Sequence, residues 1–219
     1  MIAKDLISQQ IPPLKTSDTG TKAMNWMVDF HVTHLPIVNN AQFLGLISEE
    51  DILDLDNAEE ALGAYELTLK KPFIYKDAHI YEALKVFVDL QLSVLPVIDA
   101  NNTYLGLIGY FDLLKGIARM ASLSEAGSII VLETSAKDHV LGDLIRIVEA
   151  ESVKVLSLFV NQPNPSIVEV TLKLNSLKIS RVVATLKRFN YTIKASFLES
   201  DYIDTLNERY HGLMTYLNV

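Results

Sequence analysis

One stretch of this sequence occurs twice, and the duplication constrains the fold more than any other feature. Residues 31–53 read HVTHLPIVNNAQFLGLISEEDIL, and residues 91–114 read QLSVLPVIDANNTYLGLIGYFDLL. Each copy contains Leu-Pro, two aliphatic residues, a polar turn, Leu-Gly-Leu-Ile and an Asp six residues after the Gly. The prolines Pro36 and Pro96 are 60 residues apart, and the glycines of the two copies are 61 apart. A repeat this long indicates a supersecondary unit present in tandem.

The same offset extends upstream, where Pro12 matches Pro72 and Asp29 matches Asp89. Apolar spacing and polar turns predict the same elements in each unit. These are an extended segment (13–16; 73–76), a helix (21–30; 80–90), two strands (35–38 with 43–47; 95–98 with 104–108) and a helix from Ser48 or Gly109. We expect one buried stripe on each first helix, made of Met24, Met27 and Val28, and of Ala83, Leu84, Phe87 and Val88. Residues 57–69 are predicted to form a helical connector.

This order of elements and motifs resembles a tandem pair of CBS domains, a family named from cystathionine β-synthase. The resemblance covers residues 1–120 and implies one unit at 1–60 and another at 61–120, packed about a pseudo-twofold axis. It also implies two clefts, which in that family commonly bind adenine nucleotides (AMP, ADP or ATP) or S-adenosylmethionine. The bound ligand then regulates whatever the pair is attached to.

The resemblance assigns ligand-binding roles to residues in both units. Asp51 and Asp112 match the family's ribose-binding Asp, and a carboxylate can accept hydrogen bonds from both ribose hydroxyls. Ser48 matches a Ser or Thr that contacts ribose or phosphate, whereas the second unit has Gly109 there, followed by two aromatic residues. His34 precedes Leu-Pro and is a candidate to face the first cleft. The remaining candidates are the adenine walls and nearby polar residues, namely Leu14, Thr16, Pro36, Ile37, Ile74, Lys76, Pro96 and Val97.

A second interpretation explains part of this pattern without any ligand. Ser48 followed by Glu-Glu-Asp is a good helix N-cap, and Asp51 lies where a carboxylate favours the positive end of a helix. Both interpretations of Ser48 and Asp51 stay open at this point.

Charge restricts the partners. Residues 1–126 carry 9 Lys and Arg against 17 Asp and Glu, whereas residues 127–219 carry 10 against 10. Nucleic acid is therefore excluded as a partner, because it requires clustered basic residues. Few basic groups (Lys76, Lys115 and Arg119) are candidates to meet a phosphate, so we expect a ligand of low negative charge, such as AMP or S-adenosylmethionine.

The rest of the chain predicts a separate α+β domain. After a boundary at 118–127, residues 128–199 follow the order βαββαβ, with strands at 128–134, 153–161, 167–174 and 191–198 and helices at 140–151 and from Ile179 to Phe189. Pro163-Asn164-Pro165 is predicted to be the hairpin turn. Residues 200–219 are predicted to form a terminal helix over 201–217.

This second domain is expected to be a ferredoxin-like sandwich, and its first loop resembles that of ACT domains. The candidate loop residues are Asp138, Leu141 and Gly142, with Asp138 also the expected helix cap. ACT domains often bind amino acids at domain interfaces, but a domain that only dimerises is an equal alternative.

No catalytic pattern is present, and the chain has no Cys. The five His form no metal-ligand cluster, no apolar run reaches the length of a membrane span, and residues 1–10 lack signal-peptide order. We therefore expect a cytoplasmic, non-enzymatic homodimer that regulates an unidentified protein and resembles bacterial CBS proteins of the acetoin-utilisation B type. Two alternatives remain: an amino-acid-binding regulator with a CBS scaffold, and a structural adaptor with empty clefts.

Overall fold

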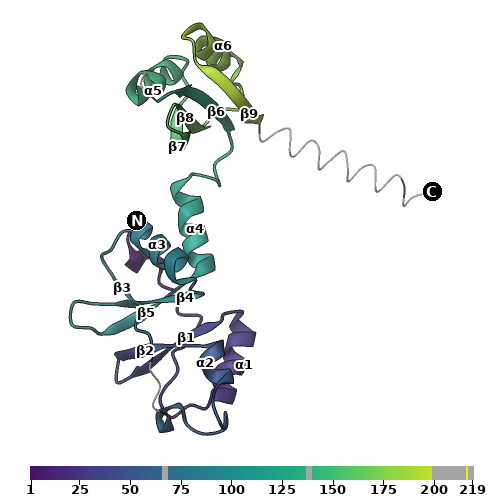
Figure 1. Cartoon of the computed structure of the whole chain (residues 1–219). Coiled ribbons are helices and arrows are strands. Elements are labelled where there is room, and N and C mark those ends of the chain that lie inside the picture. Colours follow the sequence, from purple (N-terminus) through teal and green to yellow (C-terminus); the bar gives the residue numbers. More distant parts are fainter. Residues whose placement is uncertain (66–68, 137–139, 199–215, 217–219) are drawn as a thin grey trace. The chain divides into compact units, whose positions relative to one another are not determined.

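The structure, a computed structural model, describes residues 1–65, 69–136, 140–198 and 216. The chain divides into two compact bodies, an N-terminal body (Met1–Ile117) and a C-terminal body (Ala118–Val219). The elements of the N-terminal body are η1 (Ala3–Leu6), α1 (Gly20–Phe30), β1 (His34–Asn39), β2 (Gln42–Ser48), α2 (Glu49–Leu53), η2 (Leu62–Ala64), β3 (Ile74–Tyr75), α3 (Ile80–Leu90), β4 (Val94–Ile98), β5 (Tyr104–Gly109) and α4 (Tyr110–Met120), which continues past Ile117 (Figure 1).

The two repeats have the same order of a helix, a β-hairpin and a second helix. In the first repeat, the Thr19 hydroxyl accepts a hydrogen bond from Lys22 N–H and caps the N-terminus of α1. At the C-terminus of α1, the backbone of His31 is in the left-handed region. In the second repeat, His79 caps α3 and Gln91 takes the left-handed position. The strands pair antiparallel in both hairpins, β1 with β2 and β4 with β5. The duplication in the sequence is therefore a duplication of structure.

Each repeat receives a chain segment that precedes the other repeat. Leu46 N–H on β2 donates to Lys70 O at 2.9 Å, and Ser8 N–H donates to Leu107 O on β5 at 2.9 Å. A Cβ on Gly45 would lie 2.5 Å from Leu69 Cβ, and a Cβ on Gly106 would lie 2.5 Å from Ile7 Cγ2. The glycine of Leu-Gly-Leu-Ile therefore lets the crossing segment approach the strand.

The core of the N-terminal body joins the two repeats. Val94 and Leu107 of the second repeat are fully buried in the cluster that Leu35, Ile47 and Met27 form in the first. Burial of this shared apolar surface is the main force that holds the repeats together, because hydrophobic stabilisation scales with the apolar area removed from water.

Two predictions for this body are wrong. Val28 and Val88 are each 65% exposed and Leu84 is 37% exposed, so the buried stripes of α1 and α3 exclude these three residues. The predicted connector helix is absent from the described part of 57–69, which contains only the short η2. The chain there bonds to the loop before α1 instead, since Leu62 N–H donates to Asp18 O and Gly63 N–H to Thr16 O, at 2.8 Å each.

The C-terminal body is a ferredoxin-like domain, as the order βαββαβ predicted. Its elements are β6 (Ser128–Ser135), α5 (Leu141–Ala150), β7 (Val155–Asn164), β8 (Ile167–Leu174), α6 (Ser180–Arg188) and β9 (Thr192–Leu198). The antiparallel sheet has the order β7-β8-β6-β9. Alternating residues of the central strands, such as Ile130, Leu132 and Val170, pack against Leu144 and Val148 of α5 and Leu186 of α6.

Several predictions for this body need correction or fall outside the described residues. The hairpin turn lies at 165–166, because β7 continues through Asn164, whose Oδ1 accepts from Ser166 and Ile167 N–H at 3.0 Å each. The residue at the N-cap of α5 is Val140. Asp138, the expected cap, lies outside the described residues, as does the predicted terminal helix 201–217 apart from residue 216.

Within the described residues, no helix combines the length and the apolar character needed to cross a bilayer.

Candidate functional site

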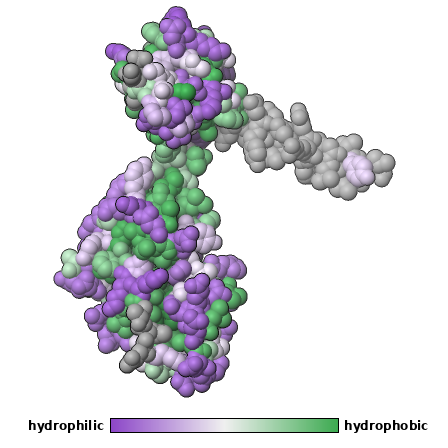
Figure 2. All heavy atoms as spheres, viewed as in Figure 1, coloured by the Kyte–Doolittle hydropathy of each residue, from purple (hydrophilic) through white to green (hydrophobic). Residues whose placement is uncertain are grey.

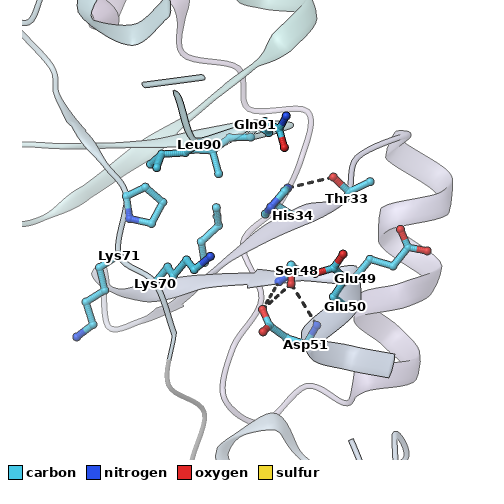
Figure 3. Close-up of a pocket in the computed structure, with 13 residues that line it drawn as sticks. Thr33, His34, Ser48, Glu49, Glu50, Asp51, Lys70, Lys71, Leu90 and Gln91 are labelled. Carbon is cyan, nitrogen blue, oxygen red and sulfur yellow. Dashed lines mark hydrogen bonds between the residues drawn. The ribbon is translucent and has the colours of Figure 1, made fainter. Parts of the chain in front are cut away.

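The N-terminal body contains a cavity of about 810 Å³ beside the first repeat, which we call the first cleft. Its walls come from the head of β1, the β2–α2 junction, the segment that crosses β2, and the end of α3 (Figure 3). The lining residues are Thr33, His34, Leu46, Ser48, Glu49, Glu50, Asp51, Lys70, Lys71, Pro72, Leu90, Gln91 and Leu92. Three of the predicted ligand-binding residues, His34, Ser48 and Asp51, are therefore brought together here.

Ser48 and Asp51 form a capping box at the start of α2. Ser48 Oγ accepts from Asp51 N–H at 3.1 Å, while Asp51 Oδ2 accepts from Ser48 N–H at 2.8 Å and from the Ser48 hydroxyl at 2.6 Å. The capping interpretation of these residues is thus confirmed.

Capping leaves half of the Asp51 carboxylate available. All three contacts with Ser48 use Oδ2 or the backbone, and within the described residues Asp51 Oδ1 accepts no hydrogen bond. The side chain is exposed and lines the cavity. A carboxylate oxygen in this position can accept a hydrogen bond from a ligand hydroxyl, so capping and ligand binding are compatible.

His34 is half-buried at the head of β1, and its ring is fixed from one side. Its Nδ1 lies 3.0 Å from Thr33 Oγ1 and 3.2 Å from Ser93 Oγ, and Ser93 Oγ also accepts from Thr33 N–H at 3.0 Å. The ring then projects into the cavity (Figure 3). This geometry satisfies one ring nitrogen within the protein and leaves Nε2 for a ligand.

Burial lowers the pKa of His34 from its ordinary value of 6.5, and the nearby Lys70 ammonium lowers it further. The carboxylates of Asp51 and Glu50 oppose this shift without reversing it. The imidazole is therefore mostly neutral at neutral pH, and its charge state depends on what enters the cleft.

Lys70 and Lys71 are functional candidates that the sequence reasoning missed. They belong to the segment before the second repeat, but the pairing of Lys70 with Leu46 places that segment against the first repeat. In Figure 3, Lys70 extends toward the interior of the cavity and Lys71 points away from it. These lysines could have been identified only from the pairing of this segment with the first repeat, and no local pattern in the sequence predicts that pairing.

Other predicted residues of the first repeat lie away from this cavity. Leu14 N–H donates to Pro36 O at 2.8 Å, and both Leu14 and Ile37 are buried in the core. Thr16 is at the opposite end of β1 from His34, where Asn39 Nδ2 donates to its hydroxyl at 2.7 Å. Pro36 is likewise buried, on β1. The first cleft is thus lined by none of the four predicted residues Leu14, Thr16, Pro36 and Ile37.

The matching position in the second repeat, which we call the second-repeat site, consists of Val94, Gly109 and Asp112. Gly109 N–H donates to Asp112 Oδ2 at 3.3 Å, which repeats half of the capping box. Lys115 lies 3.9 Å from Asp112 and also stacks over the Phe111 ring. Pro96 and Val97 are buried on β4, Ile74 is buried on β3, and Lys76 N–H donates to Ile98 O.

The C-terminal body has a groove of about 590 Å³ between α5 and α6, lined among others by Arg146, Glu151, Thr185, Arg188 and Tyr191. Thr185 donates to Glu151 across it at 2.7 Å. The candidate loop residues Leu141 and Gly142 lie in the first turn of α5 and do not line this groove. Among the described residues, no cluster of three or more His, Cys, Asp or Glu side chains could hold a metal ion.

A family model described as "CBS domain" matches residues 3–57 and 64–119. An uncharacterized protein from Methanocaldococcus jannaschii is 28% identical over 125 residues, which cover 49% of this chain and 41% of that protein. The inosine-5'-monophosphate dehydrogenase of the same organism is 24% identical over 114 residues, which cover 52% of this chain and 23% of the enzyme. The match thus spans less than half of either relative.

Solved structures also resemble part of the chain. A CBS domain pair/ACT domain protein from Thermotoga maritima has a TM-score of 0.49 and 23% identity, covering 54% of this chain and 98% of its own. The structure of CBSX2 in complex with AMP has a TM-score of 0.47 and 19% identity, covering 54% of this chain and 96% of its own.

Proposed function

The chain belongs to the CBS domain family, and on that premise we propose that it is a non-catalytic regulatory protein whose first cleft binds an adenosyl ligand. The ligand is an AMP-like nucleotide or S-adenosylmethionine. Binding shifts the tandem pair between two packings, and contacts between two copies of the chain relay the change.

The single observation that carries this proposal is the available Asp51 oxygen inside a cavity of ligand size. The cavity of about 810 Å³ falls within the roughly 300–1,000 Å³ of small-molecule sites. Asp51 Oδ1 is positioned to accept from a ribose hydroxyl while Oδ2 keeps α2 capped. CBSX2, a structure with the same domain pair, was solved in complex with AMP, which agrees with this class of ligand.

The charges of the cleft support a ligand of low net charge. Glu49, Glu50 and Asp51 line the cavity, and of its two lysines Lys70 extends into it while Lys71 points away. A triphosphate would bring more negative charge than the Lys70 ammonium can compensate beside three carboxylates. AMP and S-adenosylmethionine each satisfy this limit.

Exposed apolar side chains at equivalent positions of both repeats support the homodimer. Val28 and Val88 are each 65% exposed, and Leu53 and Leu114 are 70% and 60% exposed. Hydrophobic surface is visible on the N-terminal body in Figure 2. Because the same positions are exposed twice, a second copy can cover both patches through one symmetric interface. A ligand that binds one packing better would then shift the dimer toward that packing.

We place the protein in the cytoplasm, acting on a separate target protein. The sequence contains no catalytic motif, and regulation by a bound ligand requires none.

Mass spectrometry of small molecules released from the natively purified protein tests the proposal. We expect an adenosyl compound in about equimolar amount with the chain or less, followed by calorimetric binding of AMP or S-adenosylmethionine to the emptied protein. Recovery of an amino acid in place of an adenosyl compound would reject the proposal in favour of a regulator that acts through the C-terminal body. Tighter binding of metal-free ATP than of either ligand would reject the argument from charge.

A further inference from the structure

The first cleft contains two nitrogen groups that no part of the proposed ribose contact uses. His34 Nε2 has no hydrogen-bond partner and Lys70 Nζ has no ion-pair partner among the residues that the structure describes. Both line the same cavity as Asp51 (Figure 3). Partnerless nitrogen donors that face one cavity are the chemistry that binds an anion.

We propose that His34 and Lys70 form a phosphate-binding end of the first cleft, so that it selects an adenosyl monophosphate over adenosyl ligands without phosphate. His34 takes up a proton when the phosphate binds. This inference rests on the proposed function, because it requires the ribose at Asp51.

The position of His34 supports its role as a donor. Thr33 Oγ1 and Ser93 Oγ hold Nδ1 at 3.0 and 3.2 Å, so the ring is oriented before a ligand arrives. Hydroxyl groups both donate and accept. They therefore serve neutral His34 in either tautomer as well as protonated His34, whose Nδ1 donates. Protonation costs no internal hydrogen bond.

The position of Lys70 follows from the crossing segment. Leu46 N–H donates to Lys70 O at 2.9 Å, which fixes the backbone of Lys70 against β2 beside the cleft. Its ammonium is close enough to His34 to lower the pKa of the imidazole. A phosphate dianion between the two groups would replace this repulsion with two charge-assisted hydrogen bonds.

The charged groups that face His34 come from two elements. Asp51 and Glu50 of α2 favour the protonated imidazole, and Lys70 of the crossing segment disfavours it. The last residue of α3, Leu90, and the two residues that follow it, Gln91 and Leu92, contribute no charge. Glu49 and Glu50 are exposed, so water and salt screen their repulsion of a phosphate. A phosphate dianion in the cleft favours the protonated imidazole of His34, because an opposite charge within about 4–6 Å raises the pKa of a histidine.

A ligand without phosphate lacks this gain. The sulfonium of S-adenosylmethionine adds a positive charge to a cleft where Lys70 is already unpaired, and adenosine leaves both nitrogen groups without an anion. The second-repeat site has Val94 in place of His34 and Ser8 in the place of Lys70 against its strand. The proposed phosphate end therefore belongs to the first cleft.

Ring-nitrogen NMR of the full-length protein tests the inference by measuring the pKa of His34 directly. The titration is run with the protein alone, with inorganic phosphate, with AMP, with S-adenosylmethionine and with adenosine, and His34→Asn assigns the signal. We expect AMP to raise this pKa by about one unit or more and adenosine to leave it unraised.

Lys70→Met provides the second variant, because the aliphatic stem is kept and the charge is removed. We expect AMP to bind roughly tenfold more weakly and adenosine to change less than about twofold. If AMP and adenosine both bind but neither moves the His34 pKa, the phosphate end is wrong and the adenosyl site survives. If no adenosyl compound binds, the proposed function fails together with this inference.

Discussion

The first cleft and the second-repeat site share one backbone arrangement but carry different side chains. In both, a crossing segment pairs with the second strand of a hairpin, and an Asp carboxylate caps the following helix. The first cleft adds Ser48 and His34, where the second-repeat site has Gly109 and Val94. The comparison teaches that the scaffold of a site can be duplicated while its chemistry diverges.

The largest expected effect tests whether the shared scaffold depends on the two glycines. Gly106 has φ of +145° and no room for a Cβ beside Ile7, so Gly106→Ala should destabilise the protein by about 3 kcal/mol. Gly45→Ala meets Leu69 but without the strained φ, and should cost about 2 kcal/mol. Chemical denaturation measures both.

The matched control is Gly142→Ala, because a Cβ there meets nothing within 4 Å. Its position in α5 predicts no loss of stability and a gain of up to about 0.5–1 kcal/mol. Equal stability of the wild type and the Gly106→Ala variant would contradict the role assigned to the crossing segment.

The next effect separates the two sites by their aspartates. Asp51→Ala should weaken AMP binding by roughly ten- to a hundredfold, because a ligand hydroxyl loses a charged acceptor. Asp112→Ala, the matched change in the second repeat, should leave the higher-affinity binding within about twofold. Calorimetry with AMP compares them, and Asp51→Asn controls for the cap because its amide oxygen can still accept from Ser48 N–H. If the two alanine variants lose AMP affinity equally, the proposed difference between the first cleft and the second-repeat site is wrong.

A gain-of-function variant sharpens the comparison from the other side. Gly109→Ser restores the hydroxyl that the second-repeat site lacks, although the Ser Cβ would lie a tight 3.2 Å from Asp112 Oδ2. Val94 is kept, because it is fully buried in the core that joins the repeats. The contacting atom of Asp112 is a side-chain oxygen that can move, so we expect folding to be retained and AMP to bind the second-repeat site a few-fold more tightly. Competition calorimetry in an Asp51→Ala background isolates the second-repeat site. If its affinity for AMP is unchanged, the crossing segment determines AMP binding more than the restored side chain does.

The duplicated fold could be predicted from the sequence, whereas the composition of the first cleft could not. The Leu-Pro and Leu-Gly-Leu-Ile spacing identified both hairpins, and the capping box was visible as Ser48 followed three residues later by Asp51. Lys70 was missed because it is 24 residues from Leu46, its partner in the structure, and local periodicity contains no information on that pairing. Val28 fits the helical spacing of apolar residues, yet it is exposed, because the face of α1 that packs against the core is narrower than the apolar face of the helix.

The smallest effect is the pH dependence of stability that His34 contributes. Its pKa is lower in the folded protein than the ordinary 6.5, so both states are neutral at higher pH and His34 then contributes nothing. As pH falls through 6.5, the unfolded chain binds a proton first, and folded stability declines until the lower folded pKa is passed. Thermal melts of wild type and His34→Asn should therefore diverge between pH 7.5 and 5, with the wild type losing more. If the stabilities of the two proteins change with pH in parallel, burial does not lower the pKa of His34 in the folded protein.

The crystal structure of the full-length protein grown with AMP tests the central claim most directly. The account predicts a nucleotide in the first cleft, with a ribose hydroxyl on Asp51 Oδ1 and the phosphate between His34 Nε2 and Lys70 Nζ. A nucleotide bound at Asp112 while the first cleft remains empty would contradict it.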